Sequence, residues 1–534
     1  MDMQIDALVI CFMHAHADPA HEIQAEAIAR ARWPDGFITR SSDVLREIRE
    51  FERGSAAALN GYIQPLMSRY LSRLSAALSE GGLVPPLLVM QGNGGMMSAE
   101  VGASQAVQTV MSGPAAGAIA AARIAHDAGY SNVLACDMGG TSFDLTLIKD
   151  GRPAMTTEKD MAYGVPLHVP MVDIHTIGAG GGSIARVDQS GLLKVGPESA
   201  GADPGPIAYG RGGPAPTVTD ANVILGRINP KGLTGRDGLD VALVRERFAD
   251  TLGRPLGLDA TDAAAAVLAV ANNEMANAAR MVSVERGHDP RDFVLFAFGG
   301  GGPLHAIDIA RELGIPKVLV PRHPGITSAI GCVLADVRHD YVRSVHQPLA
   351  EVDEAAIGEI LAAHESAGRD LIASEAIAVT QIEVVHSADL LYRGQSHEFR
   401  VPIDAADFDR GNLEATFVER YRERFEIELD GMVPMLVNVR TEVIGRRDVE
   451  LSADVLEADT AHQGDETREI WFDGGWHCSR VYRREALSPG MTIVGPAVVE
   501  QLDTTIPIEP GARVDVDTAG NLLIGVSEKI RDPD

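Results

Sequence analysis

The feature that most constrains this chain is an acidic, glycine-rich turn between two short apolar runs. Residues 132–136 are typical of a buried strand, Asp137-Met-Gly-Gly-Thr-Ser-Phe-Asp144 of a tight turn, and residues 145–148 of the returning strand. Consecutive backbone N–H groups in such a turn bind phosphate oxygens, and glycine allows close approach to the backbone. A leading carboxylate can hold Mg²⁺ near the phosphates. The turn alone leaves two interpretations open, an ordinary hairpin and a phosphate loop.

A second glycine-rich loop follows another apolar strand. Residues 293–298 lead through Gly299-Gly-Gly-Gly-Pro303 into a helix predicted over 304–313. A strand that opens through glycines into a helix N-terminus suits a sugar, a base or a phosphate lying against the backbone. The spacing is not GxGxxG, and no acidic residue follows at the distance that a dinucleotide-binding fold requires. A dinucleotide-binding fold is therefore not supported.

A third loop, Gly178-Ala-Gly-Gly-Gly-Ser183, follows an aspartate and a histidine. Two such residues, spaced two apart, can bind a divalent ion or relay a proton. Helix capping and ordinary hydrogen bonds are the alternative. The candidate catalytic residues here are Asp173 and His175. The candidate phosphate or substrate loop is Gly180, Gly181 and Gly182.

Other histidines and the cysteines show weaker signals. His14 and His16 follow the first predicted strand and stand beside Asp18-Pro19. We interpret both as loop histidines rather than metal ligands. The four cysteines show no CxxC or Cys/His metal spacing, which is typical of buried, reduced thiols in a cytoplasmic protein. They are Cys11, Cys136, Cys332 and Cys478.

The N-terminal part has the pattern of an α/β protein. Strand, helix and strand are expected in turn over residues 6–39. A long helical region is predicted over residues 42–80, with breaks near Gly61 and Pro65.

Further along, the pattern changes to one rich in β-structure. Residues 194–216 are rich in glycine and proline and lack periodicity, which predicts a loop. A helix is expected over residues 353–375, followed by alternating apolar and polar runs and then by recurrent hairpin signals. We predict three segments: the remainder of a first lobe, a core lobe with the glycine loops, and a C-terminal β-rich domain. Their ranges are 1–106, 107–345 and 346–534.

Composition limits the function classes. The chain has 534 residues, and its 45% hydrophobic and 23% charged residues are the balance of a folded protein with more than one core. Asp and Glu outnumber Lys and Arg by 75 to 46, which gives a net charge of −29. Such a surface repels phosphate backbones and anionic lipids, so nucleic acid and membranes are not expected partners. No stretch approaches the ~20 apolar residues of a membrane span.

The order of the motifs resembles that of the actin-like and chaperone ATPase superfamily. A small-residue helix beginning at Ser112-Gly-Pro-Ala-Ala-Gly precedes the Asp137 turn, as a connecting helix precedes the second phosphate loop there. Gly299 to Pro303 resembles the adenosine loop, and Pro324-Gly-Ile-Thr-Ser-Ala-Ile-Gly331 a second connecting helix. The resemblance implies an α/β, actin-like (ribonuclease H-like) ATPase fold. The two helices would then cross as the hinge of a nucleotide cleft.

Longer motifs, spread over essentially the whole chain, are similar to those of the hydantoinase A/5-oxoprolinase family. That family includes N-methylhydantoinase A subunits, ATP-dependent 5-oxoprolinases, and subunits of acetone and acetophenone carboxylases. The motifs are His175-Thr-Ile-Gly-Ala-Gly-Gly-Gly-Ser-Ile, Val195-Gly-Pro-Glu-Ser-Ala-Gly-Ala-Asp-Pro-Gly-Pro206, Thr217-Val-Thr-Asp-Ala-Asn222, Val284-Glu-Arg-Gly-His-Asp-Pro-Arg291, Tyr392-Arg-Gly-Gln-Ser396 and Gly495-Pro-Ala-Val-Val-Glu500.

The resemblance implies the ATP-handling A subunit of a cytoplasmic enzyme that hydrolyses a cyclic amide of the hydantoin, N-methylhydantoin or 5-oxoproline type. ATP and Mg²⁺ would be the cofactors, and a hydantoinase B-type subunit the partner in a hetero-oligomer. Asp137 would be a catalytic residue and the Mg²⁺ ligand. The phosphates would lie on Gly139, Gly140 and Thr141. The adenosine would lie on Gly299, Gly300, Gly301 and Gly302.

One departure from the family pattern leaves alternatives open. Family members usually begin with a strand and a first phosphate loop of the type DxGGTFTD, whereas Asp2 and Asp6 lead directly into a strand typical of a later part of the first lobe. An incomplete first lobe is therefore expected. Three explanations stay open: another polypeptide supplies this loop, the start of the gene is truncated, or this chain binds nucleotide weakly or not at all. The alternative functions are an ATP-dependent carboxylase subunit and a non-catalytic scaffold subunit. A chaperone-like ATPase is disfavoured because the C-terminal part has no obvious peptide-binding lid.

Overall fold

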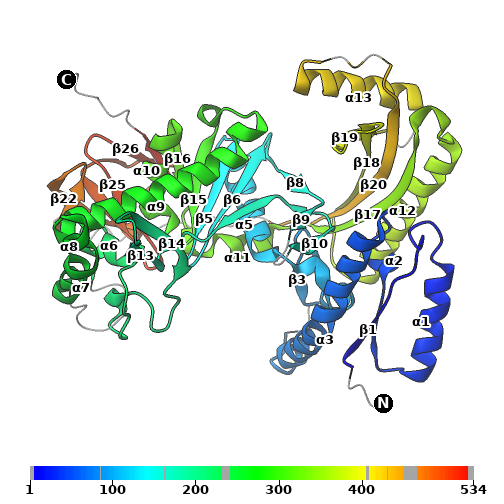
Figure 1. Ribbon diagram of the computed structural model, residues 1–534, viewed down its shortest axis with the longest axis horizontal. Helices are drawn as coiled ribbons and strands as arrows, with labels where there is room; N and C mark the ends of the chain where they lie inside the picture. The colour runs from blue at the N-terminus through cyan, green and yellow to red at the C-terminus, as the bar shows by residue number, and fades with distance from the viewer. Residues whose placement is uncertain are drawn as a thin grey trace. The chain divides into compact units, whose positions relative to one another are not determined.

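The computed structural model divides into two compact units, each made of several stretches of the chain (Figure 1). The first unit comprises Met1–Ala115, Met155–Val172 and Cys332–Glu450. The second unit comprises Ala116–Ala154, Asp173–Gly331 and Leu451–Asp534. These boundaries do not coincide with the three consecutive segments expected from the sequence. The structure describes residues 5–83, 86–160, 164–230, 241–404, 408–427, 429, 431–449 and 466–526.

The first unit begins with the strand, helix and strand that the sequence predicts. Strands β1 (Ala7–Ile10) and β2 (Phe37–Arg40) pair in parallel and are joined by α1 (Ala20–Arg32). After the single turn of α2 (Ser41–Val44), α3 (Glu50–Glu80) runs for 31 residues.

The predicted breaks at Gly61 and Pro65 are wrong, because α3 continues through both residues. Both are buried, and a Cβ at Gly61 would lie only 2.6 Å from the Val9 side chain. Packing against β1 therefore offsets the hydrogen bond that the proline removes from the helix.

A six-stranded sheet forms the larger part of the first unit, in the order β19-β18-β20-β17-β4-β3. Its long strands β17, β18 and β20 pair antiparallel, while β4 pairs in parallel with β17. Helix α12 (Glu354–Ser374) confirms the helix expected over 353–375. Aromatic residues of α13 (Arg410–Phe425) pack against Tyr392 of β18. The strands are β3 (Leu88–Met90), β4 (Met96–Ser98), β17 (Val337–Pro348), β18 (Gln381–Tyr392), β19 (Phe399–Ile403) and β20 (Pro434–Arg446).

The second unit is built on a nine-stranded sheet in the order β12-β6-β5-β15-β16-β27-β26-β23, with β7 beside β6. Strand β6 is antiparallel to both of its neighbours, β12 and β5, whereas β15 runs parallel to β5 and β16 parallel to β15. The strands are β5 (Val133–Met138), β6 (Phe143–Lys149), β7 (Arg152–Pro153), β12 (Ile174–Ile177), β15 (Val294–Phe298), β16 (Lys317–Val320), β23 (Thr492–Val494), β26 (Arg513–Val516) and β27 (Leu522–Gly525).

Helices cover both faces of this sheet (Figure 1). Helices α9 (Ala260–Val282) and α10 (Gly302–Leu313) pack on the face that carries Leu134 and Cys136. Helix α5 (Ser112–Asp127) packs on the opposite face, against Val133 and Ala135. Because side chains alternate along a strand, Asp137 belongs to the α5 face.

Two further observations concern segments that the sequence left uncertain. Strand β14 (Leu193–Ser199) pairs with β13 (Ser183–Val187), so the loop predicted over 194–216 is wrong at its start. The expected loop rested on glycine and proline content, which does not reveal that these residues form backbone hydrogen bonds with a neighbouring strand. A hairpin turns at Asp473-Gly474, as predicted, and begins a four-stranded sheet. Its strands are β21 (Thr467–Phe472), β22 (Gly475–Arg483), β24 (Ala497–Glu500) and β25 (Thr505–Ile508).

The two small-residue helices, α5 and α11 (Thr327–Leu334), contact each other through their backbones. A Cβ at Gly331 would lie 1.8 Å from the carbonyl oxygen of Ala116. The chain passes between the two units inside both helices, after Ala115 and after Gly331. A hinge at this crossing stays a prediction.

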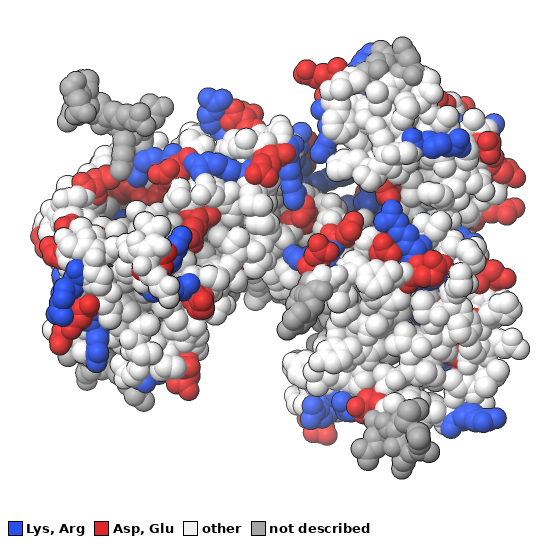
Figure 2. All heavy atoms as spheres, viewed as in Figure 1, with Lys and Arg blue, Asp and Glu red and all other residues white. Residues whose placement is uncertain are grey.

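Acidic and basic side chains are interspersed on the face of the molecule that Figure 2 shows. In the described parts of the chain, no helix combines the length and the apolar character needed to cross a membrane.

Candidate functional site

The Asp137 turn is open to solvent on its outer side. Asp137 and Asp144 are partners across β5 and β6, and Gly139 N–H closes the turn on the Ser142 carbonyl (3.1 Å). A Cβ added at Gly139 or Gly140 would meet nothing within 4 Å. Among the residues described, no acceptor is found for the N–H groups of Gly140 and Thr141. The turn therefore offers free donors and room for an anion above the backbone.

Three polar side chains lie on the same face across neighbouring strands. Asp144 is the cross-strand partner of both Asp137 and Thr176, and the Thr176 hydroxyl donates to its carboxylate (2.6 Å). Burial, and then the charge of Asp144, raise the pKa of Asp137 to about 6, although the Ser328 hydroxyl donates to it. Two neighbouring carboxylates and hydroxyl groups are hard oxygen donors, a set that fits Mg²⁺.

The Gly299 loop lies directly against this turn. Gly299 has a φ of +77°, and a Cβ there would be 2.3 Å from Oδ1 of Asp137 and 2.5 Å from the Met138 carbonyl. Gly301 N–H donates to that same carbonyl (2.9 Å). Only glycine fits at Gly299, since both its backbone conformation and its neighbours exclude a side chain.

The Gly178–Ser183 loop also contacts the turn, but it uses its amides to do so. The N–H groups of Gly181 and Gly182 donate to the carbonyls of Gly139 (3.1 Å) and Gly140 (2.7 Å). Gly180 N–H donates to the Ser183 hydroxyl (2.8 Å), and a Cβ at Gly180 would lie 2.6 Å from Gly140. The loop supports the turn from beneath, and its binding of phosphate or substrate stays a prediction.

Asp173 and His175 lie apart from the Asp137 face. His175 is paired with Leu145, which is paired with Cys136, so by strand alternation His175 belongs to the α9 face. Asp173 accepts a hydrogen bond from Arg286. The structure thus brings together Asp137 and the three glycine loops but not this pair, whose catalytic roles stay predictions.

Sequence reasoning missed three residues near these loops. Ser328, in α11, donates to Asp137. The Thr504 hydroxyl donates to the Gly300 carbonyl (2.9 Å), and one Asp503 carboxylate oxygen accepts the Gly325 N–H (2.8 Å). The other Asp503 oxygen is buried and has no hydrogen-bond partner in the described part of the chain. Ser328 lies inside a motif that marks the segment, whereas nothing local distinguishes residues 503 and 504.

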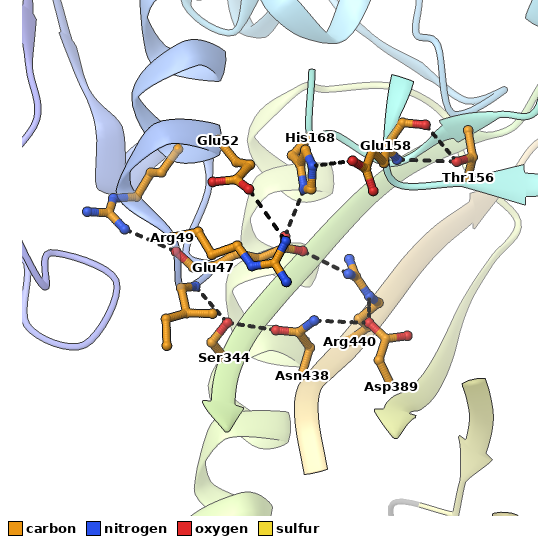
Figure 3. A network of polar contacts seen from close by, with 12 residues as sticks. Glu47, Arg49, Glu52, Thr156, Glu158, His168, Ser344, Asp389, Asn438 and Arg440 are labelled. Atoms are coloured by element: carbon orange, nitrogen blue, oxygen red, sulfur yellow. Dashed lines mark hydrogen bonds and ion pairs between the residues drawn. The ribbon is translucent and has the colours of Figure 1, made fainter. Parts of the chain in front are cut away.

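The first unit contains a separate buried network that the sequence did not predict (Figure 3). Arg440, on β20, donates to Glu47 (2.7 Å) and to Asp389 on β18. His168 lies on the other side of Glu47, with 3.7 Å between Nδ1 and the carboxylate. Although burial opposes ionisation, His168 and Arg440 hold the pKa of Glu47 below its ordinary value.

A small pocket adjoins this network. Its wall carries three guanidinium groups, and each is paired with a carboxylate: Arg338 with Asp340 (2.9 Å), Arg400 with Asp389 (3.1 Å), and Arg440 as described. Each of these guanidinium groups already has a carboxylate partner, so the described lining residues offer no unpaired positive charge to an anion. The lining residues are Met155, Thr156, Pro170, Arg338, Asp340, Tyr341, Arg400, Arg440, Thr441 and Glu442.

Models of known protein families match most of the chain, including the glycine loops. A family model described as hydantoinase/oxoprolinase matches residues 53–341, and one described as the hydantoinase/oxoprolinase C-terminal domain matches residues 356–523. The chain belongs to the hydantoinase/oxoprolinase family. All three glycine loops of this family member fall within the first match.

Two relatives and one solved structure are similar to this member of the hydantoinase/oxoprolinase family over most of its length. It is 35% identical over 531 residues to caprolactamase subunit alpha of Pseudomonas jessenii, covering 97% of this chain and 76% of that protein. It is 32% identical over 553 residues to acetophenone carboxylase gamma subunit of Aromatoleum aromaticum, covering 98% and 74%. The structure of ATP-dependent caprolactamase from Pseudomonas jessenii matches with a TM-score of 0.87 at 34% identity, over 98% of this chain and 78% of that one. The mixed α/β fold is shared with that enzyme.

Proposed function

We propose that this chain is the ATP-handling subunit of an enzyme that hydrolyses a cyclic amide. The observation that carries the proposal is the direct contact of the Asp137 turn with the Gly299 loop, which fits a phosphate site beside an adenosine site. The likeness to an ATP-dependent caprolactamase supports the nucleotide and the class of substrate. The strand order around β5, with its hairpin and two parallel strands, supports an actin-like lobe.

Each part of the site has a task in this proposal. The N–H groups of Gly140 and Thr141 hold phosphate oxygens, and the Gly299 loop lies under the adenosine. Asp137 would hold Mg²⁺, and the Ser328 hydroxyl donates a hydrogen bond to its carboxylate. Mg²⁺, when bound, supplies charge neutralisation at the phosphates. The chain itself contributes positioning and oriented donors, and Gly180 to Gly182 keep the turn in shape.

The chemistry explains why a lactam or hydantoin enzyme would use ATP. The carbonyl carbon of an amide is a weak electrophile near neutral pH, and its nitrogen is a poor leaving group. Transfer of the γ-phosphoryl group to the amide oxygen forms an O–P bond, breaks the bond to ADP, and leaves a carbon that water attacks more readily. Water adds to that carbon, and the ring C–N bond breaks as the nitrogen takes up a proton. A second water then hydrolyses the resulting acyl phosphate to a carboxylate and phosphate.

A carboxylase subunit is the second candidate, favoured by the identity to an acetophenone carboxylase subunit. In that case a carbonyl compound and bicarbonate replace the cyclic amide. Both relatives are named as subunits, which supports a hetero-oligomer in which a hydantoinase B-type chain is the proposed partner.

The test is ADP release by the full chain purified with a B-type partner. Lactams, hydantoins and 5-oxoproline are compared with acetone and acetophenone, each with and without bicarbonate. We expect a cyclic amide to stimulate ADP release, and Asp137→Ala to reduce it by roughly 100-fold or more. Asp127→Ala, at an exposed carboxylate on α5, is the matched control. Stimulation only by a ketone with bicarbonate would replace hydrolysis by carboxylation, and no release with any compound would favour a scaffold.

A further inference from the structure

Two histidines and a glutamate meet at the start of the first unit. His14 and His16 lie on the loop between β1 and α1, and Glu50 is the first residue of α3. One ligand atom from each of the three side chains lies within 4.8 Å of the other two. Imidazole nitrogens with a carboxylate oxygen are a common ligand set for divalent transition metals.

The backbone that carries the histidines is anchored at several points. Phe12 N–H donates to Glu22 (2.8 Å), and the Phe12 carbonyl accepts from Arg53 (2.9 Å). His14 N–H donates to Glu50 (3.2 Å), which ties the loop to the N-terminus of α3. His14 has a φ of 58°, a left-handed conformation that needs support from its surroundings. The loop is therefore held in a defined shape, as a preorganised binding site requires.

His16 supplies an independent indication of a missing partner. Its Nδ1 atom is buried, yet among the described residues it has no hydrogen-bond partner. A buried polar nitrogen without a partner costs free energy, and such groups are rare in folded proteins. A metal ion bound at this side of the ring would satisfy it.

Two cations lie close to the three ligands, and each has an acceptor. Arg53 is fully buried and donates to the hydroxyl of Ser41, which in turn donates to the buried carboxylate of Glu22. Arg343 donates to the Ala17 carbonyl (2.7 Å). Arg53 also lies 3.6 Å from the Glu50 carboxylate. Because Glu22 partly offsets the charge of Arg53 through Ser41, Glu50 is not the only carboxylate that balances this cation.

We propose that His14, His16 and Glu50 form a binding site for one divalent transition-metal ion, which replaces the sequence-based interpretation of the two histidines as loop residues that bind no metal. With metal–ligand bonds of about 2.0–2.2 Å, the ligand atoms around one ion lie roughly 3–3.5 Å apart. The three ligand atoms, which now lie within 4.8 Å of one another, reach this separation by a small rotation of the exposed His14 and Glu50 side chains. Three protein ligands leave at least one position for water or another molecule, which is the pattern of an open site. The site lies outside the Asp137 turn and does not depend on the proposed nucleotide chemistry.

The test is a calorimetric titration of the metal-free full chain with Zn²⁺. We expect one ion per chain, and at least ~10-fold weaker binding in His14→Asn, His16→Gln and Glu50→Gln. Asparagine tolerates the left-handed backbone at position 14, and glutamine at position 50 keeps an acceptor for the His14 N–H. His21→Asn, Glu52→Gln and Cys11→Ser are matched controls nearby, and each should bind as the unchanged chain does.

A spectrum of the unchanged chain with Co²⁺ tests the ligands without relying on any variant. We expect visible d–d bands without a thiolate-to-cobalt charge-transfer band. The proposal is overturned if the unchanged chain binds no Zn²⁺, or if all three ligand variants bind it as tightly as the unchanged chain. It is also overturned if Cys11→Ser is the change that abolishes binding, or if the thiolate band is present.

Discussion

Asp137 and Asp144 are directly paired across β5 and β6, so two carboxylates share the base of one exposed glycine turn. Burial, and in addition the like charge of Asp144, raise the pKa of Asp137 to about 6. An arrangement of this kind disfavours the folded state at neutral pH, and it is typical of a site that binds a cation. The proposed Mg²⁺ site would relieve that repulsion.

The repulsion predicts that Asp137→Asn stabilises the protein at neutral pH. The folded-state pKa lies above the ordinary value of 3.8, so the stability present below about pH 4 is lost as pH rises through 6. Because asparagine carries no charge, the free energy of unfolding of the Asp137→Asn variant at pH 7.5 should exceed that of the unchanged chain by roughly 1–3 kcal/mol. The gain should vanish toward pH 4. Urea denaturation at several pH values measures it, with Asp127→Asn as control. A loss of stability at pH 7.5 would contradict the account.

The close approach of Gly299 to Asp137 predicts that Gly299→Ala is destabilising. The added Cβ would meet the Asp137 carboxylate and the Met138 carbonyl, in a backbone conformation that alanine rarely adopts. We expect a loss of about 2–4 kcal/mol. Gly300→Ala is the control, because its nearest neighbour lies 3.4 Å away, an ordinary contact. Equal unfolding midpoints for the two variants would show that the contact is not as tight as described.

The crossing of α5 and α11 predicts a larger effect at Gly331. A Cβ there would lie 1.8 Å from the Ala116 carbonyl, so the two helices must separate. We expect Gly331→Ala to cost at least ~3 kcal/mol, measured by thermal or urea unfolding. Gly358, inside α12, has nothing within 4 Å of an added Cβ. Gly358→Ala should stabilise by about 0.5–1 kcal/mol, and the same sign in both variants would be inconsistent with the crossing.

The network around Arg440 predicts the cost of removing a buried cation that two carboxylates share. Arg440→Met removes the buried cation that Glu47 and Asp389 share and leaves them with His168 and Arg400 as ion-pair partners, which should cost about 3–5 kcal/mol. Adding Asp389→Asn to Arg440→Met should recover part of that loss. Arg369→Met, which breaks an exposed pair with Glu365, should change stability by less than ~1 kcal/mol. Urea denaturation measures the free energy of unfolding of each variant. Similar losses of stability in Arg440→Met and Arg369→Met would argue against a buried network.

Local patterns were sufficient to predict the strands and turn around Asp137. Apolar runs bounded by glycines define β5, β6 and β15 without reference to any distant residue. The continuity of α3 through Pro65 could not be predicted in this way, because packing against Val9 of β1 decides it. Likewise, β27 joins the main sheet by pairing with β16, some 200 residues earlier in the chain.

The side chains around the site were harder to predict than its backbone. Ser328 and Thr504 reach the glycine loops from distant segments, and no spacing rule relates them to Asp137. The same holds for His14 and Glu50, which are 36 residues apart and meet because the residues that follow β1 pack beside the first turns of α3. The rule that side chains alternate along a strand assigns His175 to the face opposite Asp137 only once the pairing of His175 with Leu145 is known.

The most direct test of the central claim is a calorimetric titration of the full chain with Mg·ADP, with and without a B-type partner. The account predicts one binding site, and at least ~10-fold weaker binding in Asp137→Asn than in the control Asp127→Asn. Binding that is equally tight in both variants, or absent from the unchanged chain even with the partner, would contradict the assignment of the Asp137 turn to nucleotide phosphates.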